Sequence, residues 1–182
     1  MTGVIKSSII ISVYSISFVT ENFENNIVIL DEVLSHHECE KLIDSYKPTK
    51  RWWNTFPMSI RDGYAMEIAK KIERHVNKFF QDKVEIDWCE VVRWPIGSYQ
   101  ELHVDDASQQ TILTSITYLN NNYLGGETYI ENDIKMIPKI GRTVCFDGQY
   151  YKHGVTEIKN SDRFTLPIWY KIKQASFAKH HK

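Results

Sequence analysis

The stretch that decides the fold is Val84-Glu85-Ile86-Asp87-Trp88-Cys89-Glu90-Val91-Val92-Arg93-Trp94, which is followed by the turn Pro95-Ile96-Gly97. Its β-branched and aromatic residues predict a long strand that stops at the turn. Further β-rich runs, separated by turn signals, cover residues 111–119, 127–130, 143–146 and 163–170. The last run contains Pro167, which predicts a bulge or an edge position there. Closely spaced strands of this kind predict a β-sandwich or barrel.

The residues before this stretch predict a short strand over 27–30 and two helices. Ser35 and Glu38 have the spacing of a capping box, in which the two side chains satisfy free backbone N–H groups at a helix start, and we expect that helix to end before Pro48. A second helix is predicted because apolar residues recur at helical spacing. They are Ala65, Ile68, Ala69, Ile72, Val76, Phe79 and Phe80. The fold class is therefore predicted to be α+β, with helices backing the strands.

The composition excludes several classes of protein. Hydrophobic residues make up 42% and charged residues 25% of the 182 residues, which is typical of one soluble domain, here spanning residues 1–182. The 22 basic and 23 acidic residues give a net charge of −1, so the charge favours neither nucleic acid nor membrane as a partner. Cys39, Cys89 and Cys145 form no disulfide or zinc motif, which predicts a reducing, cytoplasmic location.

Residues 8–19 are apolar enough to be compared with a signal peptide. They lack a strongly basic segment before them and a small-x-small cleavage site, and they are too short to span a bilayer. Their Ile, Val, Tyr and Phe content favours a strand instead.

The motif His103-Val104-Asp105 is the first candidate for chemistry. On a strand or directly after one, residues i and i+2 point to the same side, although an isolated motif of this form is more often a solvated pair. His153 follows a later strand and a short turn. Two histidines and one carboxylate on facing strands form the facial triad of non-haem Fe(II) oxygenases. Arg163 and Thr165 on the last strand are suited to hold the far carboxylate of a 2-oxo acid.

From about Ile27 to Tyr170 the chain resembles the 2-oxoglutarate- and Fe(II)-dependent dioxygenases, and within them the prolyl 4-hydroxylase-like branch. The resemblance depends on the order and spacing of several short motifs. They are Trp94-Pro95-Ile96-Gly97-Ser98-Tyr99, His103-Val104-Asp105, Tyr118-Leu119-Asn120, Gly125-Gly126-Glu127-Thr128, His153, Arg163 and Trp169-Tyr170. It implies a double-stranded β-helix core, also called a jelly roll or cupin-like core, with the catalytic part at about residues 84–172.

The resemblance also implies roles for the residues at matching positions. His103, Asp105 and His153 match the iron ligands, and Arg163 matches the basic residue that pairs with the distal carboxylate of 2-oxoglutarate. Tyr118 matches a tyrosine that hydrogen-bonds the same carboxylate.

Two aromatic positions complete the expected cosubstrate site. Trp94 replaces a tyrosine that contacts 2-oxoglutarate in the family and offers only an N–H donor, so we expect Tyr99 to take part of that role.

The substrate is expected to meet aromatic and basic side chains. Trp169 matches a tryptophan beside the prime-substrate site of prolyl hydroxylases. The loop with Trp52 and Trp53, with Arg61 beyond it, has two interpretations: a lid that recognises substrate by stacking and charge, or core aromatics under a helix.

The resemblance implies hydroxylation of an unactivated C–H bond with O₂ and 2-oxoglutarate, release of succinate and CO₂, and ascorbate as a supporting reductant. A prolyl residue of a peptide or protein is the expected substrate; a free amino acid or small metabolite is the alternative. Trp169 occupies the position of a second arginine in nucleic-acid demethylases, and Asp105 is retained where halogenases lose it. Two further hypotheses are a non-catalytic sensor of iron or 2-oxoglutarate and a zinc hydrolase.

Overall fold

The computed structural model describes residues 27–48, 51–80, 83–105, 108, 110–131 and 134–173, so the strand predicted within residues 8–19 lies outside the described residues. The helices are α1 (His36–Asp44) and α2 (Gly63–Val76). The strands are β1 (Val28–Leu30), β2 (Phe56–Ser59), β3 (Val84–Trp94), β4 (Gln100–His103), β5 (Leu113–Tyr118), β6 (Leu124–Gly125), β7 (Thr128–Ile130), β8 (Ile134–Met136), β9 (Thr143–Phe146), β10 (His153–Val155), β11 (Ile158–Lys159) and β12 (Arg163–Ile172).

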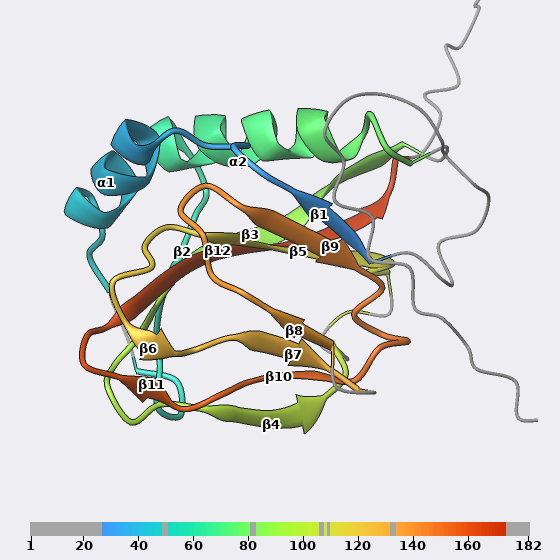
Figure 1. Cartoon of the computed structure of the whole chain (residues 1–182). Coiled ribbons are helices and arrows are strands. Elements are labelled where there is room, and N and C mark those ends of the chain that lie inside the picture. Colours follow the sequence, from blue (N-terminus) through green and yellow to red (C-terminus); the bar gives the residue numbers. More distant parts are fainter. Residues whose placement is uncertain are drawn as a thin grey trace, which may run out of the picture.

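Most of the strands form two facing sheets (Figure 1). The larger sheet has the order β1-β9-β5-β12-β3-β2, and the smaller has the order β4-β10-β7-β8. Strands β11 and β6 form a separate pair at one end. Helices α1 and α2 cover the outer face of the larger sheet, so its inner face looks toward the smaller sheet. The expected jelly-roll core is confirmed.

The helices form where the sequence predicts them, with one difference at an end. Ser35 and Glu38 make the expected capping box at the start of α1. Helix α2 ends at Val76, before the predicted Phe79 and Phe80. Asn77 explains the early end, because its side-chain amide binds both the N–H and the carbonyl of Val84 and so joins the helix end to β3.

Strand β12 lies in the middle of the larger sheet, between β5 and β3. The prediction of an edge position at Pro167 is therefore wrong. Pro167 is paired with Ile116 of β5, while the register with β3 shifts two residues later, between Trp169 and Tyr170. Residues 165–168 of β12 are all buried, which agrees with a central position even though Pro167 offers no backbone N–H.

The cysteines are free and buried, in agreement with a role as small apolar side chains. Burial raises the pKa of the Cys39 thiol to about 11 and those of Cys89 and Cys145 to about 12. Within the described part of the chain, the search for membrane-crossing helices finds none of sufficient length and apolar character.

Candidate active site

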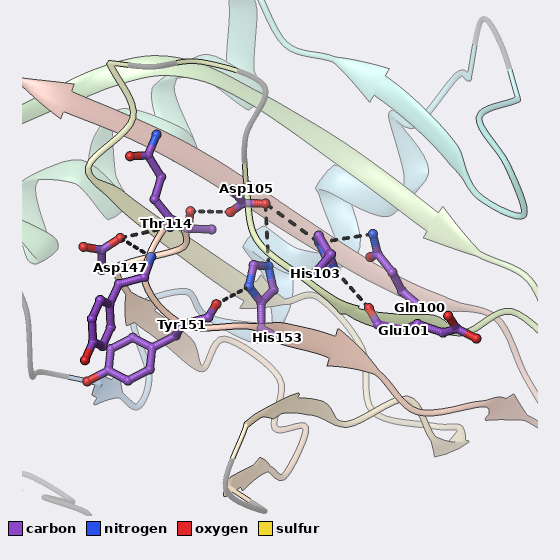
Figure 2. Close-up of polar contacts among 10 residues, drawn as sticks. Gln100, Glu101, His103, Asp105, Thr114, Asp147, Tyr151 and His153 are labelled. Carbon is purple, nitrogen blue, oxygen red and sulfur yellow. Dashed lines mark hydrogen bonds and ion pairs between the residues drawn. The ribbon is translucent and has the colours of Figure 1, made fainter.

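The three predicted metal ligands converge between the sheets (Figure 2). His103 ends β4 and His153 begins β10, and these two residues are direct partners in the smaller sheet. Asp105 follows β4, so its carboxylate lies on the same side as the His103 ring. Asp105 Oδ1 is 3.9 Å from His103 Nε2 and 3.6 Å from His153 Nε2, and one ligand atom of each residue lies within 4.8 Å of the others.

Backbone carbonyls orient both imidazoles. His103 Nδ1 lies 3.0 Å from the carbonyl of Glu101, and His153 Nδ1 lies 3.0 Å from that of Tyr151. These contacts assign the proton to Nδ1 and leave both Nε2 atoms as acceptors beside Asp105, where His103 Nε2 also lies 3.2 Å from the amide nitrogen of Gln100. Burial also lowers the pKa of His153, against the opposing effect of Asp105, so the ring is held neutral as metal ligation requires.

Asp105 is held from the opposite sheet by groups that the sequence analysis did not single out. Thr114 of β5 donates a hydrogen bond of 2.6 Å to Oδ2, and the Asp105 N–H donates to the carbonyl of Gly148. A Cβ at position 148 would lie 2.3 Å from Asp105 Oδ2 and 2.4 Å from Thr114 Oγ1. A larger residue at position 148 would therefore displace the Asp105 carboxylate or the Thr114 hydroxyl, whereas glycine leaves Oδ1 directed at the histidines.

Arg163 lies in the same cavity, which has a volume of about 400 Å³. Its side chain is buried, with the residue 1% exposed, and Nη2 donates to Thr128 Oγ1 at 3.2 Å. Within the described ranges no carboxylate forms an ion pair with Arg163, and its Nε has no hydrogen-bond partner. A buried cation is costly without an anion, so this end of the cavity is suited to an anionic group.

The other expected cosubstrate residues fall into two groups. Trp94 and Thr165 line the cavity with Arg163, and the buried Trp94 Nε1 has no hydrogen-bond partner among the described residues. Tyr118 packs behind the wall: its ring lies 5.4 Å from the Arg163 guanidinium, and its hydroxyl donates to the Met136 carbonyl. Tyr99 is exposed and does not line the cavity.

Tyr123 is a further buried residue beside Arg163 that the sequence analysis did not identify. Its ring and the Arg163 side chain both approach Gly126, and its hydroxyl has no hydrogen-bond partner among the described residues. Burial raises the pKa of Tyr123, so the hydroxyl keeps its proton. In the sequence, Tyr123 merely follows an asparagine-rich turn, and that position does not indicate a function.

The expected substrate residues are also divided by the structure. Trp169 lines the cavity and stacks on Trp88 of β3, with ring centroids 3.9 Å apart and planes at 11°. Trp52 lies at the cavity wall although it is 59% exposed, which places it at the mouth. Trp53 is 75% exposed and off the wall, and Arg61 lines a different cavity, beside α2. The core-aromatic interpretation of Trp52 and Trp53 is therefore wrong.

The residues present fit a divalent metal and a dicarboxylic 2-oxo acid. Two imidazole nitrogens and one carboxylate oxygen converge from one side, which leaves coordination positions open toward the cavity. The guanidinium of Arg163, which has no acidic partner among the described residues, would supply the counter-charge for a carboxylate of the cosubstrate.

Comparison with known proteins supports the fold. No protein-family model and no curated protein sequence matches the chain. Among solved structures, it is similar to a viral collagen prolyl hydroxylase of Paramecium bursaria Chlorella virus-1 in its 2-oxoglutarate complex, with a TM-score of 0.66 and 23% identity over 81% of this chain and 96% of that one.

Two other solved structures have the same fold. A prolyl hydroxylase of Trichoplax adhaerens in complex with a peptide fragment of the hypoxia-inducible factor has a TM-score of 0.64 and 18% identity over 80% of this chain and 83% of that one. HygX of Streptomyces hygroscopicus, with nickel and 2-oxoglutarate bound, has a TM-score of 0.65 and 10% identity over 81% and 83%. The chain thus has the fold of the 2-oxoglutarate oxygenases, as its sequence motifs predict.

Proposed function

We propose that the protein is an Fe(II)- and 2-oxoglutarate-dependent dioxygenase that hydroxylates an unactivated C–H bond, with a prolyl residue of a peptide or protein as substrate. One observation carries the proposal: a single cavity contains the His-Asp-His cluster and a buried arginine without an acidic partner among the described residues. A buried arginine is normally paired with a carboxylate. Arg163 instead lines the cavity that contains His103, Asp105 and His153.

His103, Asp105 and His153 would hold the metal through two Nε2 atoms and a carboxylate oxygen. When bound, ferrous iron and 2-oxoglutarate supply the oxidation, in which O₂ delivers one oxygen atom to succinate and the other to the substrate as CO₂ is released. Thr114 and Gly148 hold Asp105 so that Oδ1 faces the metal position. The carbonyls of Glu101 and Tyr151 keep both histidine protons on Nδ1.

Arg163 would bind the distal carboxylate of 2-oxoglutarate. Trp94 Nε1, which has no hydrogen-bond partner among the described residues, and the hydroxyl of Thr165, which lines the same cavity, would serve as further donors. Tyr118 supports Arg163 from behind through its ring, and Val92 and Ile116 keep the wall apolar. These residues bind and orient the cosubstrate and exclude water, so that oxidation is confined to the bound substrate.

The substrate would enter past Trp52 and lie against Trp169. An exposed indole at the mouth favours a substrate that extends beyond the cavity, as a peptide does. The similar fold of a prolyl hydroxylase bound to a peptide supports the same choice. We also propose that residues 1–182 form one domain with its catalytic core at about 84–172, and that the protein acts in the cytoplasm.

Succinate formation tests this proposal. The protein is incubated with Fe(II), 2-oxoglutarate and ascorbate, together with proline-containing peptides or with free amino acids. We expect a peptide to raise succinate formation and to gain one oxygen atom by mass spectrometry. Asp105→Ala should abolish both signals, whereas Asp44→Ala, an exposed carboxylate at the end of α1, should leave them unchanged. Stimulation by free amino acids alone would contradict the peptide assignment, and unchanged turnover in Asp105→Ala would contradict the metal site.

A further inference from the structure

Two neighbouring side chains each bury a polar atom that has no hydrogen-bond partner within the described part of the chain. The atoms are Arg163 Nε and the Tyr123 hydroxyl, and both are closed to solvent. A Cβ at Gly126 would lie 2.8 Å from Tyr123 Cε2 and 3.1 Å from Arg163 Cδ, so the two side chains approach each other over that glycine. Tyr123 also packs in one apolar cluster with Trp94, the strand partner of Arg163. Since Nε–H donates and a hydroxyl oxygen accepts, each atom can satisfy the other.

The electrostatics of Tyr123 place its hydroxyl close to the guanidinium. Burial raises the pKa of Tyr123, and the positive charge of Arg163 is the largest effect that opposes this rise. The burial of a hydroxyl without a partner costs free energy, and phenylalanine would fill the same space without that cost. The tyrosine is therefore explained if the Nε–H of Arg163 is the partner of its hydroxyl.

The guanidinium of Arg163 has a single hydrogen-bond acceptor among the residues that the structure describes. Nη2 donates to Thr128 Oγ1 at 3.2 Å, and the Thr128 N–H donates in turn to the Tyr118 hydroxyl. That hydroxyl donates to the Met136 carbonyl, so the acceptor is anchored in the smaller sheet. One hydrogen bond fixes a point of the planar group, but the group can still turn about that point. A second contact, at Nε, would fix its direction.

We infer that Tyr123 is a positioning residue whose hydroxyl accepts a hydrogen bond from Arg163 Nε and so directs the guanidinium at the distal carboxylate of 2-oxoglutarate. This inference rests on the proposed function, because it takes Arg163 to be the partner of that carboxylate. Thr128 and Tyr123 would then hold the guanidinium from two sides and leave its other N–H groups for the cosubstrate. A guanidinium that is oriented in advance loses less conformational freedom on binding, so Tyr123 increases the affinity without touching the ligand.

Binding measured without turnover tests this inference. The protein is saturated with Mn(II) in the absence of O₂, and the dissociation constant of 2-oxoglutarate is measured by calorimetry. The samples are the wild type, Tyr123→Phe, which keeps the ring and removes the hydroxyl, Arg163→Lys, and the double variant. Tyr170→Phe is the matched control, because Tyr170 lies on the same strand as Arg163 and also buries its hydroxyl. That hydroxyl contacts Ser115 Oγ at 3.0 Å, in the core that includes residues of α1 and α2.

We expect Tyr123→Phe to raise the dissociation constant of 2-oxoglutarate about 10-fold, because it removes a hydrogen bond to a charged group. The dissociation constant of Mn(II) should stay unchanged, since the hydroxyl acts only through Arg163. Lysine has no Nε–H, so in the Arg163→Lys protein the further change Tyr123→Phe should alter 2-oxoglutarate binding by less than about 2-fold. Tyr170→Phe should bind both ligands as the wild type does.

Two results for 2-oxoglutarate would overturn the inference. One is wild-type affinity in Tyr123→Phe. The other is an equal loss with arginine and with lysine at position 163, because a general loosening of the site would act in both proteins. A Tyr123→Phe protein that loses Mn(II) affinity as well, or that is unfolded by circular dichroism, would show that the hydroxyl supports the fold, and would also overturn the positioning role.

The wild-type titration separates this inference from the proposed function. Folded wild-type protein that binds Mn(II) and does not bind 2-oxoglutarate would contradict the dioxygenase assignment itself. Wild type and Tyr123→Phe that bind 2-oxoglutarate equally would overturn the role of Tyr123 and leave the dioxygenase assignment standing.

Discussion

Replacement of Thr114 by valine should weaken metal binding without disturbing the fold. Thr114 is 1% exposed, and its hydroxyl donates a 2.6 Å hydrogen bond to Asp105 Oδ2. Valine keeps the shape of threonine and removes only the donor. A hydrogen bond to an ionised group contributes about 1.5–3 kcal/mol, which corresponds to roughly 10- to 150-fold in an equilibrium constant. Loss of a group that orients a metal ligand typically costs about 10- to 100-fold in affinity. We therefore expect Thr114→Val to raise the metal dissociation constant by about 10- to 100-fold.

Calorimetric titration with Mn(II) under anaerobic conditions measures the effect, and Thr114→Ser should restore most of the affinity because serine keeps the hydroxyl. Thr117→Val is the matched control, because Thr117 lies on the same strand and is as buried as Thr114. The change removes a hydrogen bond of 2.7 Å between Thr117 and Thr143, and this bond does not involve Asp105. Unchanged metal affinity in Thr114→Val, or an equal loss in Thr117→Val, would refute the positioning role of Thr114.

Three further outcomes can be measured. Gly148→Ala should abolish metal binding in titrations, because the added methyl group meets Asp105. The control Gly97→Ala has open space around the new methyl group but a φ of +82°, so it should lower only the stability, by about 1 kcal/mol. Equal metal affinities of the two variants would contradict the steric argument. Arg163→Lys should raise the dissociation constant for 2-oxoglutarate by about 100-fold and leave Mn(II) binding intact, since lysine lacks the bidentate fork; unchanged 2-oxoglutarate binding would exclude Arg163 as its partner. Hydrogen bonding to Arg142 lowers the pKa of Asp31 below its ordinary value of 3.8, so the folded state favours the charged carboxylate. Asp31→Asn should therefore cost about 1 kcal/mol in denaturant unfolding at neutral pH, and the difference should shrink as the pH falls through the lowered pKa; a constant difference would contradict this linkage.

The sequence predicted the parts of the fold that depend on local pattern. The capping box at Ser35 and the β-rich runs of β3 and β9 appear with the expected bounds, because capping and β-propensity act within a few residues. Strands β2, β4, β6, β8, β10 and β11 were not predicted. They are only two to four residues long, and they are extended because neighbouring strands provide partners, which a local pattern does not reveal.

The candidate site was predictable where a motif carries the chemistry. His103, Asp105 and His153 were found from residue type, order and strand placement, and they lie together. Thr114 and Tyr123 were missed, because neither belongs to a motif and only the folding of distant segments brings them beside Asp105 and Arg163. Arg61 was assigned to the substrate site because it is close in sequence to the loop with Trp52 and Trp53. Strand β2 separates it from that loop, and Arg61 lines the other cavity, beside α2.

The central claim, that one cavity binds iron and 2-oxoglutarate together, is tested most directly by visible spectroscopy. Metal-free protein is mixed anaerobically with Fe(II) and 2-oxoglutarate, and the charge-transfer absorption of a chelated 2-oxo acid is recorded for the wild type and for Asp105→Ala. The account predicts the band in the wild type and its loss in Asp105→Ala, with both proteins folded by circular dichroism. Absence of the band from folded wild-type protein, or an undiminished band in Asp105→Ala, would contradict it.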